Sequence, residues 1–280
     1  KNMLAKGSDL LVFDIDRRAM ADVVANGGKA ASLPEIGESC EVVFTILPNG
    51  SIVKDVLFGP EGVAATLKAG AVVVDMSSVT PVDSRFYSER LAEQGVHFLD
   101  APVSGGEPKA IDGTLSFMVG GNEAVFARIL PLLKQMGSNA VLVGGPGSGS
   151  ITKLTNQIVV NLNIAALGEA MVFAAKAGVD PEKVFLAIRG GLAGSAVMEA
   201  KAPMILERNF KPGGKISINH KDIKNVLTTA HELDIPVPMS AQLFEIMQNL
   251  KVRGLMDDDH SGLVKYFEQL AQTEVKKAGT

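Results

Sequence analysis

The spacing of apolar residues changes along the chain near Gly149. Before it, short apolar runs predict strands, and segments with helical spacing lie between several of them. Runs such as Ala71–Val74 are continuously apolar, as in strands buried on both faces of a parallel sheet. Strands that alternate with helices indicate a doubly wound α/β domain, here over residues 1–146. The expected strands are Leu10–Ile15, Glu41–Leu47, Ala71–Asp75, His97–Leu99, Leu115–Val119 and Ala140–Val143, and the expected helices are Ala19–Asn26, Ile52–Leu57 and Pro81–Gln94.

Helical spacing dominates the rest of the chain. One long helix is predicted over Ser150–Ala177, with Gly178 ending it, and such a helix is long enough to join two domains. Lys215–Ile218 is the only further strand candidate. We therefore predict an all-helical domain over residues 147–280. Its remaining expected helices are Pro181–Arg189, Val197–Glu207, Lys221–Leu233, Ser240–Val252 and His260–Lys276.

Composition narrows the class of protein. The net charge is −4, which does not favour nucleic acid as a partner. The single cysteine, Cys40, excludes an internal disulfide and a cysteine-based metal cluster, and fits a cytoplasmic protein. The most apolar long stretch, Ile158–Phe173, is interrupted by polar residues, so no apolar run is expected to reach the roughly 20 residues of a membrane helix.

The first residues predict the tail of a helix. Lys1–Lys6 has helical character and Gly7 is a typical terminator. A G-x-G-x-x-G turn that would bind a dinucleotide pyrophosphate should come before such a helix, and the sequence has none there. We expect the natural protein to be longer at this end, with that turn and the central strand of the sheet.

Asp14 is the first candidate for ligand binding, because it lies at the end of the first predicted strand of what would be a Rossmann-type domain. An acid at this place binds the ribose hydroxyls of a dinucleotide and repels a 2′-phosphate, which favours NAD over NADP. Arg17 and Arg18 follow closely and could instead accept a phosphate, and a plain surface acid is the alternative. NADP therefore stays open.

Three loops after predicted strands could line a ligand, since ligands of open α/β sheets bind beyond the carboxyl ends of strands. Leu47, Pro48 and Asn49 form one such loop and Ser78 belongs to the second, although both are also common turns. The third loop carries a hydroxyl and two glycines whose amides could hold a substrate carboxylate, although it could be a plain turn. Its residues are Ser104, Gly105 and Gly106.

Lys153 and Asn156 lie three residues apart near the start of the long helix, and so share one face. The positive end of the helix dipole and partial burial would lower the pKa of Lys153, as a proton donor to a carbonyl needs near neutral pH. A solvated lysine is the alternative. The glycines before this helix lack both phosphate-binding patterns, so we expect no second nucleotide site there.

Two further clusters have chemical character. Lys221 begins a predicted helix and could cover the site from the helical domain, or could simply be solvated. Asp257–His260 resembles a metal site, but consecutive acids before a helix more often cap it. We expect no metal.

These motifs together resemble the β-hydroxyacid dehydrogenase family over nearly the whole chain. The motifs are Asp100–Gly106, then Gly147–Gly149 leading to Lys153 and Asn156, then Lys221–Asp222. The resemblance implies a nicotinamide-dependent oxidoreductase with Lys153 as catalytic acid/base. Ser104, Gly105, Gly106 and Asn156 would hold the substrate, and Leu47, Pro48, Ser78 and Lys221 would approach the cofactor. It also implies a homodimer or homotetramer assembled through the helical domain.

Three stretches are most similar to family members that reduce tartronate semialdehyde (2-hydroxy-3-oxopropionate) to glycerate. Gly214 departs from the phenylalanine that the family often has there, which leaves substrate fit near it open. Other small acids remain alternatives: 3-hydroxyisobutyrate, methylmalonate semialdehyde, glyoxylate and succinic semialdehyde. A cofactor-binding module without turnover is the alternative from another class. The three stretches are Gly105–Ser116, Arg189–Ser195 and Arg208–Gly213.

Overall fold

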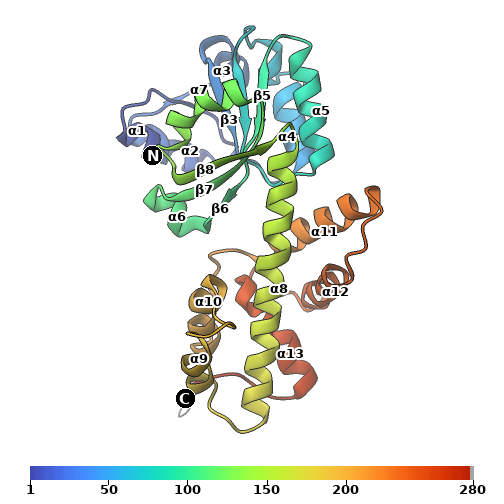
Figure 1. The fold of residues 1–280 in the computed structure, drawn as a ribbon. Coiled ribbons are helices and arrows are strands. Elements are labelled where there is room, and N and C mark those ends of the chain that lie inside the picture. Colours follow the sequence, from blue (N-terminus) through green and yellow to red (C-terminus); the bar gives the residue numbers. More distant parts are fainter. Residues whose placement is uncertain (278–280) are drawn as a thin grey trace. The chain divides into compact units, whose positions relative to one another are not determined.

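The computed structural model describes residues 1–277, and the chain divides into two compact units. The α/β unit runs from Lys1 to Lys153 and the helical unit begins at Leu154. The longest helix, α8 (Ser148–Lys176), starts in the first unit and continues into the second (Figure 1). The expected order, a doubly wound α/β domain followed by an all-α domain with a long helix spanning the boundary, is confirmed.

A six-stranded sheet forms the centre of the α/β unit. Its order is β3-β4-β5-β7-β6, with β8 pairing with β7. The ladders β3–β4, β4–β5 and β7–β8 are parallel, whereas β7 runs antiparallel to β5 and β6. Five of the strands predicted for the α/β domain form this sheet together with β6, whose two residues were too few to recognise. The strands are β3 (Val42–Thr45), β4 (Val72–Asp75), β5 (His97–Asp100), β6 (Val103–Ser104), β7 (Leu115–Gly121) and β8 (Gly137–Gly144).

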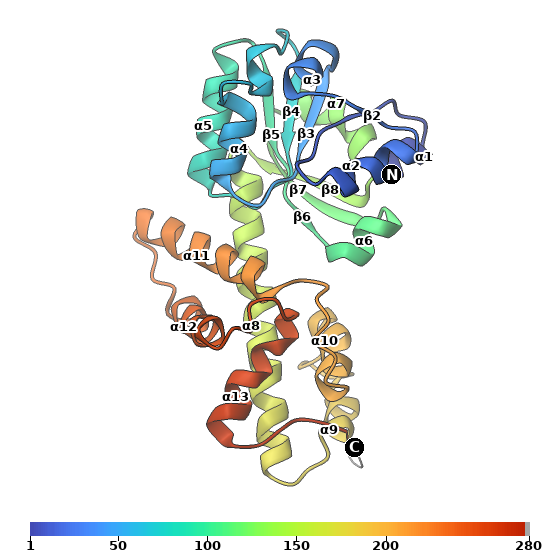
Figure 2. The ribbon, with the colours of Figure 1, turned by 180° about the vertical axis from the view of Figure 1, so that it is seen from behind.

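Alternate residues of the central strands feed two apolar clusters, one on each face of the sheet. Val73 and Phe98 pack with α4 and α5 on one face, while Val74 and Leu99 pack with α7 on the other. Figures 1 and 2 show these helices on opposite sides of the sheet. Strands covered on both faces need apolar residues at every position, which explains the continuous run in β4. The helices are α4 (Gly50–Phe58), α5 (Pro81–Ala92) and α7 (Glu123–Leu133).

A second, two-stranded parallel sheet pairs β1 with β2, and within the described residues no ladder joins it to the larger sheet. Short helices complete the unit, and the first of them confirms the helical character predicted for Lys1–Lys6. The elements are β1 (Leu11–Val12), β2 (Lys29–Ala30), α1 (Asn2–Ala5), α2 (Arg17–Ala25), α3 (Leu33–Ser39), η1 (Val63–Ala65) and α6 (Gly106–Asp112).

The helical unit is organised around α8. The amino-terminal half of this helix packs against α11 and α12, and its carboxyl-terminal half packs against α9 and α10. Figure 2 shows the same arrangement from behind. The helices are α9 (Pro181–Ile188), α10 (Ala196–Leu206), α11 (Ile216–Glu232), α12 (Pro238–Val252), η2 (His260–Leu263) and α13 (Val264–Ala271).

Four expectations about the helical unit were wrong in detail. Lys215–Ile218 is no strand: Lys215 makes one isolated bridge to Asp259, and α11 begins at Ile216. Lys221 therefore lies inside α11 rather than at its start. The last predicted helix divides into η2 and α13 and ends at Ala271.

The fourth wrong expectation was that no apolar run would reach the length of a membrane helix. α8 is long and apolar enough to cross a membrane, with a window of mean hydropathy 1.8, because its few polar residues do not outweigh its aliphatic ones. Of that window 44% is buried in the chain itself, and Leu154, Ile164 and Met171 belong to the apolar clusters of the helical unit. These contacts are typical of a core helix.

Candidate active site

Hydrogen bonds tie the ends of β3 and β4 together at the carboxyl edge of the sheet. Thr45 Oγ1 donates to Asp75 Oδ1 over 2.8 Å, and the Ser77 amide donates to the same oxygen over 3.1 Å. The Leu47 amide in turn donates to Ser77 Oγ over 2.8 Å. The loops that follow the two strands are thus held side by side, as parallel neighbouring strands predict.

Asp75 is the buried centre of this arrangement, at 1% exposed. Burial raises the pKa of its carboxyl group above the usual value, although hydrogen bonds from Ser77 and Thr45 work in the opposite direction. Its Oδ2 atom is buried and has no partner among the described residues. An acceptor left unsatisfied at a ligand-binding edge is an observation that a bound polar group would explain.

The predicted cofactor residues of these loops lie at that edge. Leu47 is half-buried and Pro48 is exposed. Asn49 caps α4 by accepting a hydrogen bond from the Ile52 amide over 3.0 Å, so its side chain has a structural use. Ser78 lies three residues beyond the end of β4, next to the buried Ser77.

Asp14 lies two residues beyond the end of β1 and is exposed. Its Oδ1 atom accepts the Asp16 amide at 2.8 Å in a tight turn, and Asp16 caps α2, whose first residue is Arg17. The apolar neighbours Phe13 and Ile15 are exposed at 46% and 92%. Exposed apolar side chains around an acid after a strand fit the adenosine half of a dinucleotide.

Ser104 is the last residue of β6, and Gly105 and Gly106 follow with φ angles of +137° and +68°. Both angles lie in the region that favours glycine. A Cβ atom on Gly105 would lie 2.7 Å from Lys109 Cβ, so a side chain would also collide there. The loop can therefore present bare backbone to a ligand, as the sequence predicts.

Lys153 and Asn156 lie on neighbouring turns of α8 and share one face, as their spacing predicts. Lys153 is partly buried and is the last residue of the α/β unit. Asn156 begins a chain of polar contacts inside the helical unit. Its Nδ2 donates to Gln157 Oε1 over 3.0 Å, and Gln157 Nε2 donates to Asp222 Oδ2 over 2.6 Å.

Lys221 joins the same network, because its ammonium group lies 3.1 Å from Asp222 Oδ1. The structure thus brings Asn156 and Lys221, 65 positions apart, into one network through Gln157, which sequence reasoning missed, and Asp222, which it named only as part of the Lys221–Asp222 motif. Gln157 and Asp222 are 6% and 1% exposed. The signal for Gln157 was a polar residue among apolar neighbours in α8, but its partner could not be read from spacing.

The acidic cluster before η2 is structural. Asp257, Asp258 and Asp259 pair with Lys215, Lys265 and Lys201, respectively. Asp259 also caps η2 by accepting the Ser261 amide over 2.9 Å, as the capping interpretation predicts. Within residues 1–277 no group of three His, Cys, Asp or Glu side chains is arranged to hold a metal ion.

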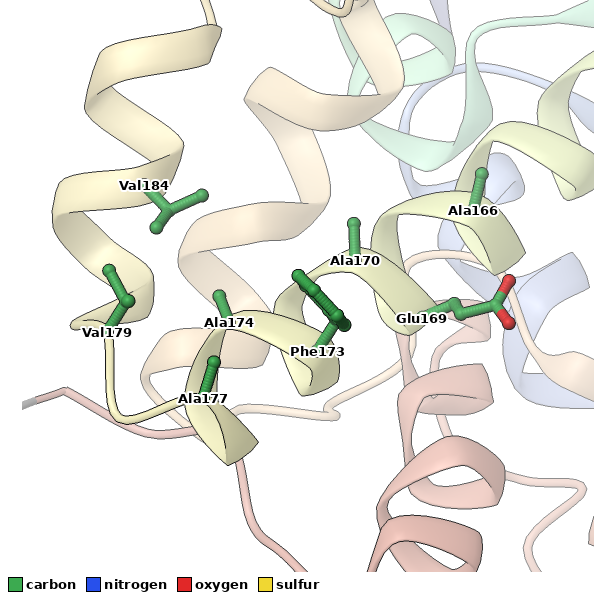
Figure 3. A pocket seen from close by; sticks show the side chains of 8 residues that line it. All are labelled: Ala166, Glu169, Ala170, Phe173, Ala174, Ala177, Val179 and Val184. Carbon is green, nitrogen blue, oxygen red and sulfur yellow. The ribbon is translucent and has the colours of Figure 1, made fainter.

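An apolar groove lies along the carboxyl-terminal half of α8 and the start of α9 (Figure 3). Phe173 stands out of α8 between small residues and is 77% exposed. None of the predicted site residues in the described part of the chain lines this groove. The lining residues are Ala166, Glu169, Ala170, Phe173, Ala174, Ala177, Val179 and Val184.

Two family descriptions match the chain in succession. Residues 1–145 match the NAD binding domain of 6-phosphogluconate dehydrogenase. Residues 147–267 match the NAD-binding domain of NADP-dependent 3-hydroxyisobutyrate dehydrogenase. The chain belongs to the β-hydroxyacid dehydrogenase family. Its cofactor class is therefore a nicotinamide dinucleotide.

The relatives within the family differ in substrate. The chain is 41% identical over 237 residues to 2-hydroxy-3-oxopropionate reductase of Escherichia coli (strain K12), covering 85% of this chain and 81% of that protein. It is 37% identical over 276 residues to 2-(hydroxymethyl)glutarate dehydrogenase of Eubacterium barkeri, covering 98% and 92%. A crystal structure of 3-hydroxyisobutyrate dehydrogenase from Salmonella typhimurium superimposes with a TM-score of 0.85 at 30% identity, covering 95% and 94%.

Proposed function

We propose that this β-hydroxyacid dehydrogenase reversibly reduces tartronate semialdehyde to glycerate, with Lys153 as the proton donor. The observation that carries the chemistry is the place of Lys153, partly buried in the second turn of α8 with Asn156 on the same helix face. The substrate assignment rests on the 41% identity to 2-hydroxy-3-oxopropionate reductase.

A nicotinamide cofactor would supply the hydride that the aldehyde carbon accepts. Lys153 supplies the proton that the developing alkoxide needs, and in the oxidative direction it removes that proton from the alcohol. Asn156 orients the oxygen atom. The assignments of Leu47, Pro48, Ser78 and Lys221 to the cofactor rest on the family resemblance.

Ser104 and the amides of Gly105 and Gly106 hold the substrate carboxylate. Two successive glycines with positive φ angles can turn their N–H groups toward an anion. Holding the acid group at a fixed distance places the neighbouring aldehyde for reaction, and such positioning contributes several kcal/mol to lowering a barrier. The loop therefore favours aldehydes that carry a carboxylate.

Two variants of Lys153 test the proton transfer. K153A removes the ammonium group, and K153R keeps the positive charge on a group that does not release its proton. We expect both to lower kcat by about a hundredfold or more, the usual scale of general acid catalysis, with NADH affinity little changed. A near-normal kcat in either variant would refute the role.

Cofactor choice is tested separately with steady-state kinetics. Exposed Asp14 should repel the 2′-phosphate of NADPH, so we expect a preference for NADH. D14A should reduce that preference, whereas R18A, which removes a positive charge from the first turn of α2, should not. A strong NADPH preference in the wild-type protein would overturn this use of Asp14.

A substrate panel discriminates the remaining alternatives. We expect the highest kcat/KM with tartronate semialdehyde, ahead of glyoxylate, succinic semialdehyde and methylmalonate semialdehyde. If another acid of the panel had the highest kcat/KM, the enzyme class would stand and the proposed substrate would be wrong. Cofactor binding without turnover of any of them would instead favour a binding module.

The groove around Phe173 also suggests how the protein assembles, and we propose that a second copy of the chain covers it. Glu169 and Lys176 are exposed on one face of α8, two turns apart, with Phe173 between them. If two copies pack antiparallel about this point, each Glu169 meets the Lys176 of the other copy. The face is thus self-complementary in charge, as a two-fold interface requires.

Light scattering after gel filtration tests the assembly. We expect the wild-type chain to form dimers or tetramers and F173D to dissociate. V252D places the same charge on a residue that is 90% exposed on α12, and should not change the mass. A monomeric wild-type protein at micromolar concentration would contradict the proposal.

A further inference from the structure

The amino terminus of α8 lacks a capping side chain of its own. The Gly147 carbonyl accepts the first helical hydrogen bond, from Ile151 over 3.0 Å, so Gly147 occupies the N-cap position. Glycine has no side-chain oxygen to accept the free amides of the first turn. Those amides nevertheless need acceptors, because Ser150 is 1% exposed.

Asp100, the last residue of β5, supplies the missing acceptor from a distant part of the sequence. Its Oδ1 accepts the Gly147 amide over 2.9 Å, and its Oδ2 accepts the Ser150 amide over 2.7 Å. Asp100 is 1% exposed, so the two bonds are shielded from water. A carboxylate at this place also complements the positive end of the helix dipole.

Two glycines make room for this carboxylate. A Cβ atom on Gly120 of β7 would lie 2.4 Å from Asp100 Oδ1, and one on Gly149 would lie 2.5 Å from the Asp100 carbonyl oxygen. Neither position has a positive φ that would itself require glycine. The absence of a side chain is therefore explained at Gly120 by the Asp100 carboxylate, and at Gly149 by the carbonyl oxygens of Asp100 and Met118, the latter only 2.3 Å from an added Cβ atom.

We propose that Asp100 is a positioning residue that acts through α8, because its carboxylate fixes the helix turn preceding Lys153. The inference rests on the proposed role of Lys153. Asp100 is also four residues before Ser104, at the start of the connection from β5 to β6. Ser84 of α5 strengthens the same turn, with its Oγ 2.8 Å from Ser150 Oγ.

The charges around Asp100 determine how protonation would act. α5 brings Arg85 near Gly147, where its Nε lies 3.2 Å from the position of an added Cβ atom. β4 contributes Asp75, whose carbonyl accepts the Ala101 amide over 2.7 Å. On α8, Lys153 follows Ser150 by three residues. Burial raises the pKa of Asp100 to about 6, against the opposing hydrogen bonds from Ser150 and Gly147, so the group is ionised at neutral pH.

The isosteric variant D100N tests the inference. It removes the charge and one of the two acceptors, and we expect kcat to fall about tenfold to a hundredfold, the effect of losing hydrogen bonds to a charged group, while the KM for NADH changes little. Loss of a negative charge beside the helix also disfavours the protonated form of Lys153. The basic limb of the pH profile for aldehyde reduction should therefore move to lower pH.

S84A is the matched control, because it removes an uncharged contact to the same helix turn. It should leave the basic limb where it is in the wild-type enzyme. If Asp100 acted only by supporting the fold, D100N would lower kcat without moving the basic limb of the pH profile. Wild-type kinetics in D100N would overturn the inference about Asp100. The proposed function would still hold in that case if K153A were inactive.

A second measurement needs no variant and covers the case in which D100N does not fold. In the wild-type protein the amide resonances of Gly147 and Ser150 should titrate together, with a midpoint at about pH 6. Amides that do not respond to a common protonation would show that Asp100 does not cap α8. This result would stand even if K153A were fully active and the proposed function failed.

Discussion

Asp100 of the α/β unit and Asp259 of the helical unit are both buried, at 1% and 0% exposed, yet their surroundings move their pKa values in opposite directions. At Asp100 burial outweighs the hydrogen bonds and raises the pKa to about 6. At Asp259 burial also disfavours the charge, but the Ser261 amide and the Lys201 ammonium group outweigh it and lower the pKa.

The difference separates two uses of a buried acid. Asp259 accepts the Gly213 and Gly214 amides in addition to Lys201, and so closes a loop of the helical unit onto η2. Asp100 accepts hydrogen bonds from neutral groups of Gly147 and Ser150, so its ionised form is costly, and we propose that its carboxylate holds the helix turn before Lys153. Strongly perturbed pKa values concentrate at functional sites, and ion pairs that hold the fold together perturb them as well.

The largest expected effect comes from breaking the structural acid. D259A leaves the Lys201 ammonium group, only 14% exposed, without its partner, and should lower the free energy of unfolding by about 3–5 kcal/mol. D257A removes a carboxylate that is 89% exposed and should cost no more than about 1 kcal/mol. Chemical denaturation of the full chain compares the two variants. Equal losses of stability in D259A and D257A would show that the buried Asp259–Lys201 pair contributes no more than the exposed Asp257–Lys215 pair.

His260, next to Asp259, makes the stability of the helical unit depend on pH. Burial and the nearby Lys201 charge lower its pKa to about 4, while Asp259 acts in the opposite direction. The unfolded chain therefore binds a proton more readily than the folded one between pH 6.5 and about 4, and stability is lost as pH falls through this range. The loss should be on the order of 3 kcal/mol.

H260Q should remove this pH dependence. Denaturation of the wild-type and variant chains at pH 7 and pH 4 measures it, because the variant has no group that titrates at this position. A difference in stability between the two proteins that is the same at both pH values would contradict the depressed pKa.

The pattern of apolar residues was enough to predict most strands of the sheet and the long α8, because burial on both faces or along one stripe produces a recognisable spacing of apolar residues in the sequence. Contacts between distant residues leave no such record. The cap of α8 comes from Asp100, 47 positions before Gly147, while the local sequence at the N-cap shows only glycine. For the same reason Lys153 and Ser104 could be proposed from motifs, but the network of Gln157 and Asp222 could not.

Asp100 gives the reverse pH dependence in the α/β unit. Because its pKa rises from 3.8 to about 6 on folding, the folded chain binds a proton more tightly than the unfolded chain between these values. Its contribution to stability is therefore fully present below about pH 4 and is lost as pH rises through 6, by on the order of 2–3 kcal/mol. D100N lacks this group, so its stability relative to the wild-type protein should increase by that amount from pH 4 to pH 7, opposite in sign to H260Q. A stability difference that does not change with pH would show that the carboxylate is not desolvated as its burial indicates, and the contrast with Asp259 would then have no electrostatic basis.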